Sequence, residues 1–214
     1  MRKYKAVLFD LDGTLVHTPD EYRQLVVEGI LAELGIKDYP DWFVDQFWFK
    51  GNREKTVRDA LAIEPSIFFA CYQHHDTRAR REQWTRVFPD VGYLATLKEM
   101  GYKIGAVTGG SPHVMEVNIN LLGKEYFDVT VSANPQAAPP LPPKPNPAGL
   151  NTCLQKLDVR PDEAFYVGNG EEDVGAAKRA GMLDVLILRG EHAPPTAASV
   201  TITSLYCLRP LLWY

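Results

Sequence analysis

The stretch AVLFDLDGTL, residues 6–15, joins an unbroken apolar run to two aspartates and a glycine. An apolar run without alternation is typical of a strand that is covered on both faces, as in a parallel sheet. Asp10 and Asp12 follow where that strand ends, and open α/β sheets bind ligands beyond the carboxyl ends of their strands. The stretch therefore predicts a buried parallel strand with a functional site at its end, with a solvated Asp-Gly turn as the alternative interpretation.

The same pattern recurs along the chain. Three further apolar runs cover residues 104–107, 164–167 and 185–188. Helical segments at 90–100 and 171–180 lie between them, and each is followed by a glycine that can end a helix. Strands that alternate with helices predict a doubly wound, Rossmann-like α/β fold with a parallel sheet. A last strand at 200–203 and a short helix from Leu205 onward complete the expected core.

The stretch from residue 16 to residue 88 interrupts this alternation, because it carries helical signals and no convincing strand. It predicts a helical domain inserted into an α/β core made of residues 1–15 and 89–214. The sequence Thr18-Pro19-Asp20-Glu21 has the pattern of a capping box with proline at the first helical position. We expect a helix to start there and to end at Gly35.

Other segments of the inserted stretch are also expected to be helical, at residues 53–62 and 66–81. Most of the aromatic residues within 42–49 are expected to pack the core of the inserted domain. The basic run at 78–81 is interpreted as a solvated helix face.

Composition and charge exclude several function classes. The chain has 214 residues, of which 45% are hydrophobic and 23% charged, an ordinary globular composition. A net charge of -4 without long runs of one sign argues against nucleic acid or a membrane as the main partner. Three scattered cysteines lack the spacing of a disulfide framework. The first apolar run is too short for a signal peptide, so we expect a cytoplasmic protein.

Two more strand ends and one loop carry groups suited to chemistry. Thr108-Gly109-Gly110 follows the second apolar run and offers a hydroxyl and flexible backbone N–H groups. Asn169 and Asp173 follow the third run and carry oxygen ligands of the hard type that Mg²⁺ prefers. Lys144 is the single cation of the proline-rich segment 138–147, which we expect to be a stiff connection, with a polyproline recognition motif as the alternative. Together these groups predict a phosphoryl-transfer site.

Four segments, in this order, resemble the motifs of the haloacid dehalogenase superfamily. Residues 10–15 are similar to its first motif, DxDGT, and Thr108 stands at the threonine or serine of the second. The sequence KPNP at 144–147 is similar to the context of the third-motif lysine, and VGNGEEDVGAAKRAG at 167–181 resembles the fourth motif. The match covers nearly the whole chain. The insertion at 16–88 corresponds to a helical cap of the C1 type, which the resemblance implies selects the substrate.

The resemblance implies an Mg²⁺-dependent phosphatase that acts on a small phosphorylated metabolite. Asp10 would attack phosphorus and form an aspartyl-phosphate, while Asp12 would act as general acid and then as general base. Thr108 and Lys144 would hold the phosphoryl oxygens. Mg²⁺ would bind an Asp10 oxygen, the backbone carbonyl of Asp12 and a side chain of the acidic loop.

One departure from the family concerns that acidic loop. The fourth motif usually has aspartate where this chain has Asn169, whereas Asp173 is retained. Asparagine keeps an oxygen for the metal but removes a negative charge, so we expect weaker Mg²⁺ binding. Glu171 or Glu172 offers compensation, with a helix N-terminal role favoured by the dipole as the alternative. The ligand is left open among Asn169, Glu172 and Asp173.

Other functions are compatible with parts of this pattern. A phosphomutase uses the same groups, and the motifs do not separate it from a phosphatase. A haloacid dehalogenase attacks carbon and has no need of Asp12, and a non-enzymatic binding protein is favoured only by Asn169. In the inserted stretch, Lys50 and Arg53 are candidates for reading the polar end of the substrate, with a solvated loop as the alternative. The oligomeric state is not indicated by the sequence.

Overall fold

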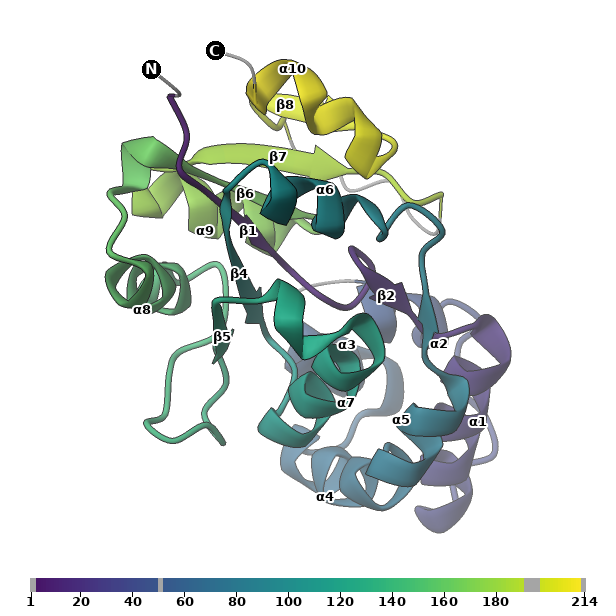
Figure 1. Cartoon of the computed structure of the whole chain (residues 1–214). Helices are drawn as coiled ribbons and strands as arrows, with labels where there is room; N and C mark the ends of the chain where they lie inside the picture. The colour runs from purple at the N-terminus through teal and green to yellow at the C-terminus, as the bar shows by residue number, and fades with distance from the viewer. Residues whose placement is uncertain (1–2, 50–51, 191–196, 213–214) are drawn as a thin grey trace. The chain divides into compact units, whose positions relative to one another are not determined.

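The computed structural model describes residues 3–49, 52–190 and 197–212. Its contacts divide the chain into two compact units (Figure 1). The core unit comprises residues 1–17 and 87–214, and the helical unit comprises residues 18–86. The helical unit therefore starts and ends two residues inside the stretch 16–88 that the sequence marks as an insertion.

The core unit is built on a six-stranded parallel sheet with the order β5-β4-β1-β6-β7-β8. Its strands are β1 (Ala6–Phe9), β4 (Lys103–Thr108), β5 (Val129–Ser132), β6 (Ala164–Gly168), β7 (Leu183–Ile187) and β8 (Val200–Ile202). Its helices are α6 (Tyr93–Glu99), α7 (Pro112–Leu122), α8 (Ala148–Leu157), α9 (Glu171–Ala180) and α10 (Arg209–Leu212). Short 3-10 helices are η1 (Lys124–Tyr126), η2 (Pro161–Glu163) and η3 (Leu205–Leu208). The predicted doubly wound α/β fold is confirmed.

Strand β1 lies in the middle of this sheet and is buried on both faces. Val7 and Phe9 pack into one hydrophobic cluster, together with residues of α6, α7 and η3. Ala6 and Leu8 pack into a second cluster, together with residues of α8 and α9 (Figure 1). Burial on both sides explains why the sequence of β1 shows no alternation.

Strand β1 also lies at the point where the chain changes direction across the sheet. The chain adds β4 and β5 on one side of β1 and then returns to place β6 on the other side. A reversal of this kind opens a crevice at the carboxyl ends of the strands. The aspartates that follow β1 are thus placed at the position where such folds bind ligands.

Strand β5 and the exact ends of some helices were not expected from the sequence. β5 lies at the sheet edge, where it pairs only with β4 among the described strands, and Val129 and Thr130 are only partly buried. It therefore lacks the continuous apolar run that reveals the central strands. The C-terminal segment expected as one helix from Leu205 onward is a 3-10 turn followed by α10.

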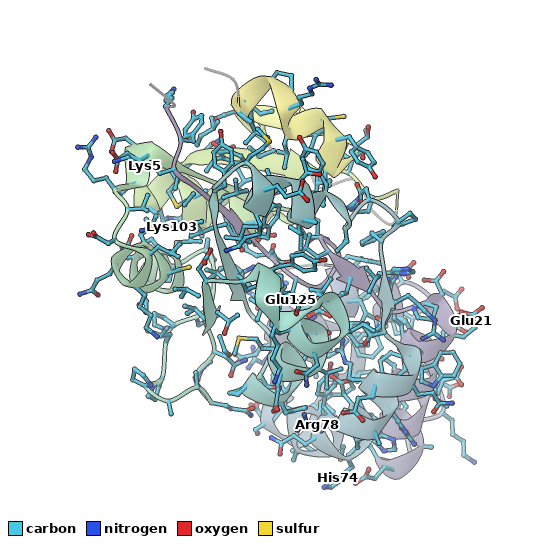
Figure 2. The ribbon with its side chains drawn as sticks, in the orientation of Figure 1. Lys5, Glu21, His74, Arg78, Lys103 and Glu125 are labelled. Carbon is cyan, nitrogen blue, oxygen red and sulfur yellow. The ribbon has the colours of Figure 1, made fainter. Side chains whose placement is uncertain are left out.

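The amino-terminal edge of the sheet carries ordinary surface contacts. Lys5 precedes β1 and forms an ion pair with Glu163, with 2.5 Å between Lys5 Nζ and Glu163 Oε1. Lys103 is the first residue of β4, and its ammonium group donates to the carbonyl oxygen of Leu157. Both lysines are labelled at this edge in Figure 2. The acidic residues of the first loop lie at the opposite edge.

The helical unit contains α1 (Asp20–Glu33), α2 (Phe43–Phe49), α3 (Arg53–Leu61), α4 (Pro65–His75) and α5 (Arg78–Trp84). As expected for most of the aromatic residues within 42–49, Phe43 and Phe47 are fully buried in its core, together with Phe68, whereas Trp42 is 40% exposed. Helix α1 ends before Gly35, which has a φ of 69°. The predicted capping box is wrong, because Pro19 occupies the N-cap position and no side chain caps the helix.

Two very short strands were also missed within the inserted stretch. β2 (Val16–His17) pairs with β3 (Arg86–Val87) where the chain passes between the two units. Each strand has two residues, too few for any periodicity to mark it.

The single helix expected at 66–81 is instead two helices, α4 and α5, separated by a buried carboxylate. Asp76 accepts hydrogen bonds from Tyr22 Oη at 2.5 Å and from Tyr72 Oη at 2.6 Å. Arg81 binds the same carboxylate through Nε at 2.5 Å and Nη2 at 2.9 Å, and only 5% of Arg81 is exposed. The interpretation of the basic run as a solvated face is therefore wrong for Arg81, although Arg78 is exposed.

The cysteines and the lengths of the helices bear on the possibilities of disulfide bonding and membrane insertion. Cys71, Cys153 and Cys207 are free cysteines. None of the helices within the described ranges combines the length and the apolar character that crossing a bilayer requires.

Close packing between β4 and its neighbours yields a stability prediction. A Cβ added to Gly105 would lie 2.5 Å from Cys153 Sγ and 3.0 Å from Leu8 Cγ. We expect Gly105→Ala to lower the free energy of unfolding by about 1–3 kcal/mol through overpacking, as measured by urea denaturation. The control is Gly92→Ala, because a Cβ there meets nothing within 4 Å. Equal stability of the two variants would contradict close packing around Gly105.

Candidate active site

Three neighbouring strands end together and bring the predicted site residues to one edge of the sheet. Phe9, the last residue of β1, pairs with Ala106 of β4 and with Val167 of β6. The backbone N–H of Asp10 donates to the carbonyl oxygen of Val167 at 2.9 Å. Asp10 and Thr108 therefore leave the sheet side by side, and the loop after β6 begins next to them.

Lys144 is the centre of a buried cluster at this edge. Its Nζ lies 2.6 Å from Asp10 Oδ1, 2.5 Å from Asp173 Oδ1 and 3.0 Å from Tyr166 Oη. The Lys144 side chain is only 6% exposed. The lysine of the proline-rich segment thus reaches the strand end that carries Asp10, as the sequence predicts.

The charges of the cluster do not balance. The pKa of Asp10 is raised to about 7, because burial, helped by Asp173 and Asp12, raises it more than the Lys144 ammonium lowers it. Burial alone would lower the pKa of Lys144, but Asp10 and Asp173 hold it well above its ordinary value. Lys144 is therefore charged, and the carboxyl groups of Asp10 and Asp173 share this one ammonium. The excess of hard oxygen donors fits a divalent cation such as Mg²⁺.

Both oxygens of Asp173 are already bound by the protein. Oδ2 accepts the backbone N–H groups of Asn169 at 3.1 Å and Gly170 at 2.9 Å, at the start of α9. Oδ1 contacts Lys144 and lies 3.2 Å from Tyr166 Oη. Asp173 thus holds Lys144 and the N-terminus of α9 at the same time.

Asn169 lies against the loop that carries the first motif. Its Oδ1 is 3.4 Å from Thr14 Oγ1, and the Thr14 hydroxyl is also placed to donate to Asp10 Oδ2 at 3.3 Å. Gly13 has a φ of 79°, and a Cβ added there would lie 2.1 Å from Asn169 Nδ2. Glycine is required at this position, because it permits both the turn and the close approach of the two loops.

The loop after β4 is held from behind by β5 and the residues that follow it. Ser132 Oγ donates to the Gly110 carbonyl at 2.7 Å, and Asn134 Nδ2 donates to the Gly109 carbonyl at 2.8 Å. Thr108 is buried, and its Oγ1 accepts the Gly110 N–H at 3.0 Å. The sequence predicts that the backbone N–H groups of this loop are available to a ligand. This prediction is wrong for Gly110, because its N–H already donates to Thr108 Oγ1.

Comparison with known proteins identifies the family. A sequence model described as haloacid dehalogenase-like hydrolase matches residues 4–181. The chain belongs to this family.

Curated relatives of this haloacid dehalogenase-like hydrolase are named as phosphatases. It is 30% identical over 195 residues to the phosphoglycolate phosphatase of Aquifex aeolicus, covering 87% of this chain and 85% of that protein. It is 30% identical over 186 residues to the pyrophosphatase PpaX of Bacillus cereus, covering 84% and 81%. It is also 30% identical over 207 residues to the glyceraldehyde 3-phosphate phosphatase of Methanopyrus kandleri, covering 88% and 85%. The chain is therefore an enzyme, a phosphatase of the haloacid dehalogenase family.

Solved structures agree with this assignment at the level of the fold. A HAD phosphatase from Thermococcus onnurineus is 28% identical with a TM-score of 0.67, covering 97% of both chains. A haloacid dehalogenase-like family protein from Streptococcus pneumoniae has a TM-score of 0.80 at 19% identity, covering 98% of this chain and 99% of that one.

Several residues of the phosphatase site were not found by sequence reasoning. Tyr166 is hidden in the apolar run of β6, yet its hydroxyl donates to the Val107 carbonyl at 2.8 Å and contacts Lys144. Asn118, fully buried in α7, donates from Nδ2 to Asp12 Oδ2 at 3.0 Å. A polar group within an otherwise apolar strand or helix face is the available signal. Thr14 is part of the first motif, but its contact with Asp10 needed the fold.

The candidates for substrate recognition belong to other parts of the chain. Lys50 lies outside the described residues. Arg53, in the helical unit, places its guanidinium carbon 5.3 Å from the ring centre of Phe47 and 5.5 Å from that of Trp48. These contacts give Arg53 a packing role within its own unit.

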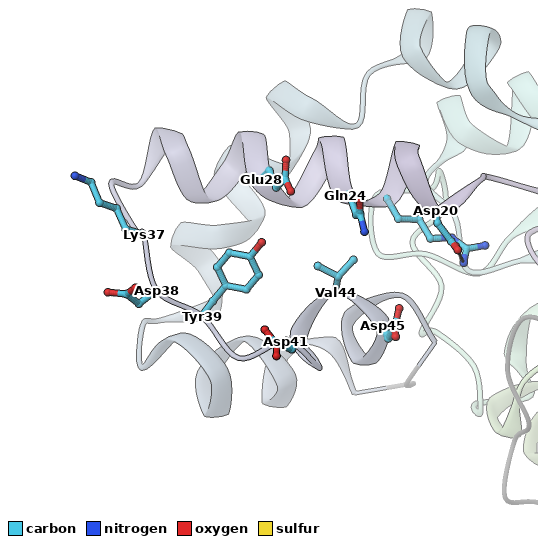
Figure 3. A pocket seen from close by; sticks show the side chains of 10 residues that line it. Asp20, Gln24, Glu28, Lys37, Asp38, Tyr39, Asp41, Val44 and Asp45 are labelled. Carbon is cyan, nitrogen blue, oxygen red and sulfur yellow. Dashed lines mark hydrogen bonds and ion pairs between the residues drawn. The ribbon is translucent and has the colours of Figure 1, made fainter.

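The helical unit also contains a cavity of about 590 Å³ beside α1 (Figure 3). Its charged lining residues are the acids Asp20, Glu28, Asp38, Asp41 and Asp45 and the bases Arg23 and Lys37. Because acids outnumber bases, this lining disfavours an anionic phosphate ester.

The raised pKa of Asp10 yields a pH prediction for the metal-free protein. The carboxyl group has an ordinary pKa of 3.8 and a pKa of about 7 in the folded protein. Between these values the folded state binds a proton that the unfolded chain releases, so stability should fall as the pH rises through this interval. Asp10→Asn removes the group, so its melting temperature should fall less between about pH 5 and pH 8. The exposed Asp162→Asn is the control, and an unchanged pH dependence in Asp10→Asn would exclude Asp10 as the group responsible.

Proposed function

We propose that this phosphatase hydrolyses a small phosphorylated metabolite through an aspartyl-phosphate on Asp10, with Mg²⁺ as cofactor. The observation that carries the proposal is the buried cluster in which Asp10, at the end of β1, contacts Lys144. The names of three relatives refer to phosphoglycolate, pyrophosphate and glyceraldehyde 3-phosphate, which supports a small phosphate compound as the substrate class.

In the first step, a carboxylate oxygen of Asp10 forms a bond to phosphorus while the bond between phosphorus and the leaving oxygen breaks. The leaving oxygen takes a proton from Asp12. In the second step, the oxygen of water bonds to phosphorus and Asp12 takes the proton of that water. The bond to Asp10 then breaks, which releases inorganic phosphate and restores both carboxyl groups.

The surrounding residues orient the nucleophile and stabilise charge. Lys144 and Thr14 lie next to different oxygens of Asp10, at 2.6 Å and 3.3 Å, so the carboxylate plane is fixed before substrate binds. We propose that Lys144 and Thr108 hold the phosphoryl oxygens, because an ammonium and a hydroxyl in a buried site stabilise negative charge strongly. Gly109 and Gly110 form the backbone around Thr108.

The donors that would hold Mg²⁺ are an Asp10 carboxylate oxygen, the Asp12 backbone carbonyl and Asn169 Oδ1. Asn169 Oδ1 is favoured over Asp173 because both Asp173 oxygens are bound by protein groups, whereas Asn169 faces Thr14 and the first loop. The proposed donor set combines one carboxylate with a backbone carbonyl and an amide oxygen; within the described ranges, no group of three His, Cys, Asp or Glu side chains is arranged to hold a metal. When bound, the ion neutralises charge and allows an anionic nucleophile to approach an anionic substrate.

The helical unit is proposed as the cap that selects the substrate, with Lys50 and Arg53 as candidates. The contact between Asn118 and the Asp12 carboxylate supports a phosphatase over a dehalogenase, which has no need of Asp12. A phosphomutase stays an open alternative. The cytoplasmic location and the exclusion of nucleic acid and membrane partners stay predictions from the sequence.

The proposal is tested by measuring phosphate release from 2-phosphoglycolate, pyrophosphate and glyceraldehyde 3-phosphate, with Mg²⁺ and with a chelator. We expect turnover of at least one of them only with Mg²⁺. Asp10→Asn should reduce that turnover by about 10³-fold or more, because an amide is a poor nucleophile. Asp162→Asn serves as the control. A folded Asp10→Asn protein with undiminished turnover would exclude Asp10 as the nucleophile.

The assignment of Asn169 gives a separate prediction on metal affinity. Asn169→Asp restores a negative charge beside the proposed ion, so the Mg²⁺ concentration for half-maximal activity should fall by about tenfold. Asn120→Asp adds the same charge on the exposed face of α7 and should leave that concentration unchanged. An unchanged midpoint in Asn169→Asp, with a large shift in Glu172→Gln, would move the ligand role to Glu172.

A further inference from the structure

Asn118 is an unusual residue for its place in the fold. It lies in α7 between Val117 and Ile119, and it is fully buried. Its Nδ2 donates to Asp12 Oδ2 at 3.0 Å, across 106 residues of sequence. Among the described residues, its Oδ1 is buried without a hydrogen-bond partner.

A purely structural role does not account for this arrangement. A buried carbonyl oxygen without a partner lowers stability, and leucine would fill a similar volume with no polar group to satisfy. Residues that cost stability in this way are typical of functional sites. The group that benefits from Asn118 is the Asp12 carboxylate.

We propose that Asn118 is a positioning residue that fixes the orientation of Asp12 for proton transfer. The inference rests on the proposed function, in which Asp12 is the general acid and base. Because Asn118 donates to Oδ2, that oxygen acts as an acceptor in both protonation states of Asp12. Oδ1 is therefore the oxygen that gives the proton to the leaving group and later takes one from water.

This role has a kinetic signature that a packing role lacks. The value of kcat/KM covers the steps up to phosphoryl transfer, in which Asp12 protonates the leaving oxygen. An alkoxide leaving group needs that proton, whereas 4-nitrophenolate leaves readily without it. Loss of the Asn118 N–H should therefore slow alkyl phosphates much more than 4-nitrophenyl phosphate.

The experiment compares Asn118→Leu with wild type on two substrates. These are 4-nitrophenyl phosphate and the alkyl phosphate that wild type hydrolyses fastest. We expect kcat/KM to fall by about tenfold or more on the alkyl ester and by about threefold or less on the aryl ester. The melting temperature should be equal to that of wild type or higher. Asn120→Leu, the same change on the exposed face of α7, should alter neither substrate.

A second variant and a double mutant make the test independent of packing. Asn118→Ala also removes the N–H donor but packs differently from leucine, so it should show the same preference for the aryl ester. In an Asp12→Asn background, Asn118→Leu should cause no additional loss on the alkyl ester, because Asn118 acts through Asp12.

The possible failures are distinguishable. Equal losses on both esters, or a full additional loss in the Asp12→Asn background, would overturn the role of Asn118 and leave the proposed function intact. If the Asp12→Asn variant hydrolyses the alkyl ester as fast as wild type, Asp12 is not the general acid and base, and that part of the proposed function is wrong.

Discussion

The ion cluster around Lys144 is the constraint on which the site depends. A lysine whose side chain is 6% exposed needs negative partners for its ammonium group, and Asp10 and Asp173 supply them at 2.6 Å and 2.5 Å. These three residues come from the end of β1, the proline-rich loop and the start of α9. Their contacts therefore tie three distant segments of the chain to one edge of the sheet, and Tyr166 supports the lysine from β6.

The excess of negative charge around Asp10 lowers the stability of the metal-free protein but suits the proposed activity. Burial raises the pKa of Asp10, and the nearby carboxylates of Asp173 and Asp12 add to this, so the metal-free fold carries repulsion that a purely structural arrangement would avoid. In the proposed mechanism, this excess negative charge attracts the cation, and Asp10 is the nucleophile. The unpartnered oxygen of Asn118 is a smaller cost of the same kind, paired with control of Asp12.

The fold was readable from the sequence where burial alone decides structure. β1 and β6 are buried on both faces, so an apolar run marks each of them, and α9 begins and ends at the predicted residues. The sequence-based predictions were wrong where contacts between residues distant in sequence determine the local structure. Asp76 breaks a helix because Tyr22 and Arg81 allow it to be buried, and neither contact is visible in local sequence. Asn118 escaped notice for the same reason, whereas Asp10, Thr108 and Lys144 were found because strand ends and motif order mark them.

The charges around Lys144 also explain why we assign different roles to Asn169 and Asp173. One carboxylate at the start of α9 is already committed to Lys144 and to two backbone N–H groups, and it cannot leave them without stranding a buried ammonium. The neighbouring position is then the one free to face the first loop, and Asn169 Oδ1 lies there beside Thr14. In the proposed metal site, a neutral amide at residue 169 supplies a donor oxygen without adding a further negative charge beside Asp10. Under the proposed metal site, the departure from the family pattern reduces repulsion in the metal-free site and weakens the attraction for the ion. Metal affinity is therefore the property that we expect to change most when residue 169 is replaced.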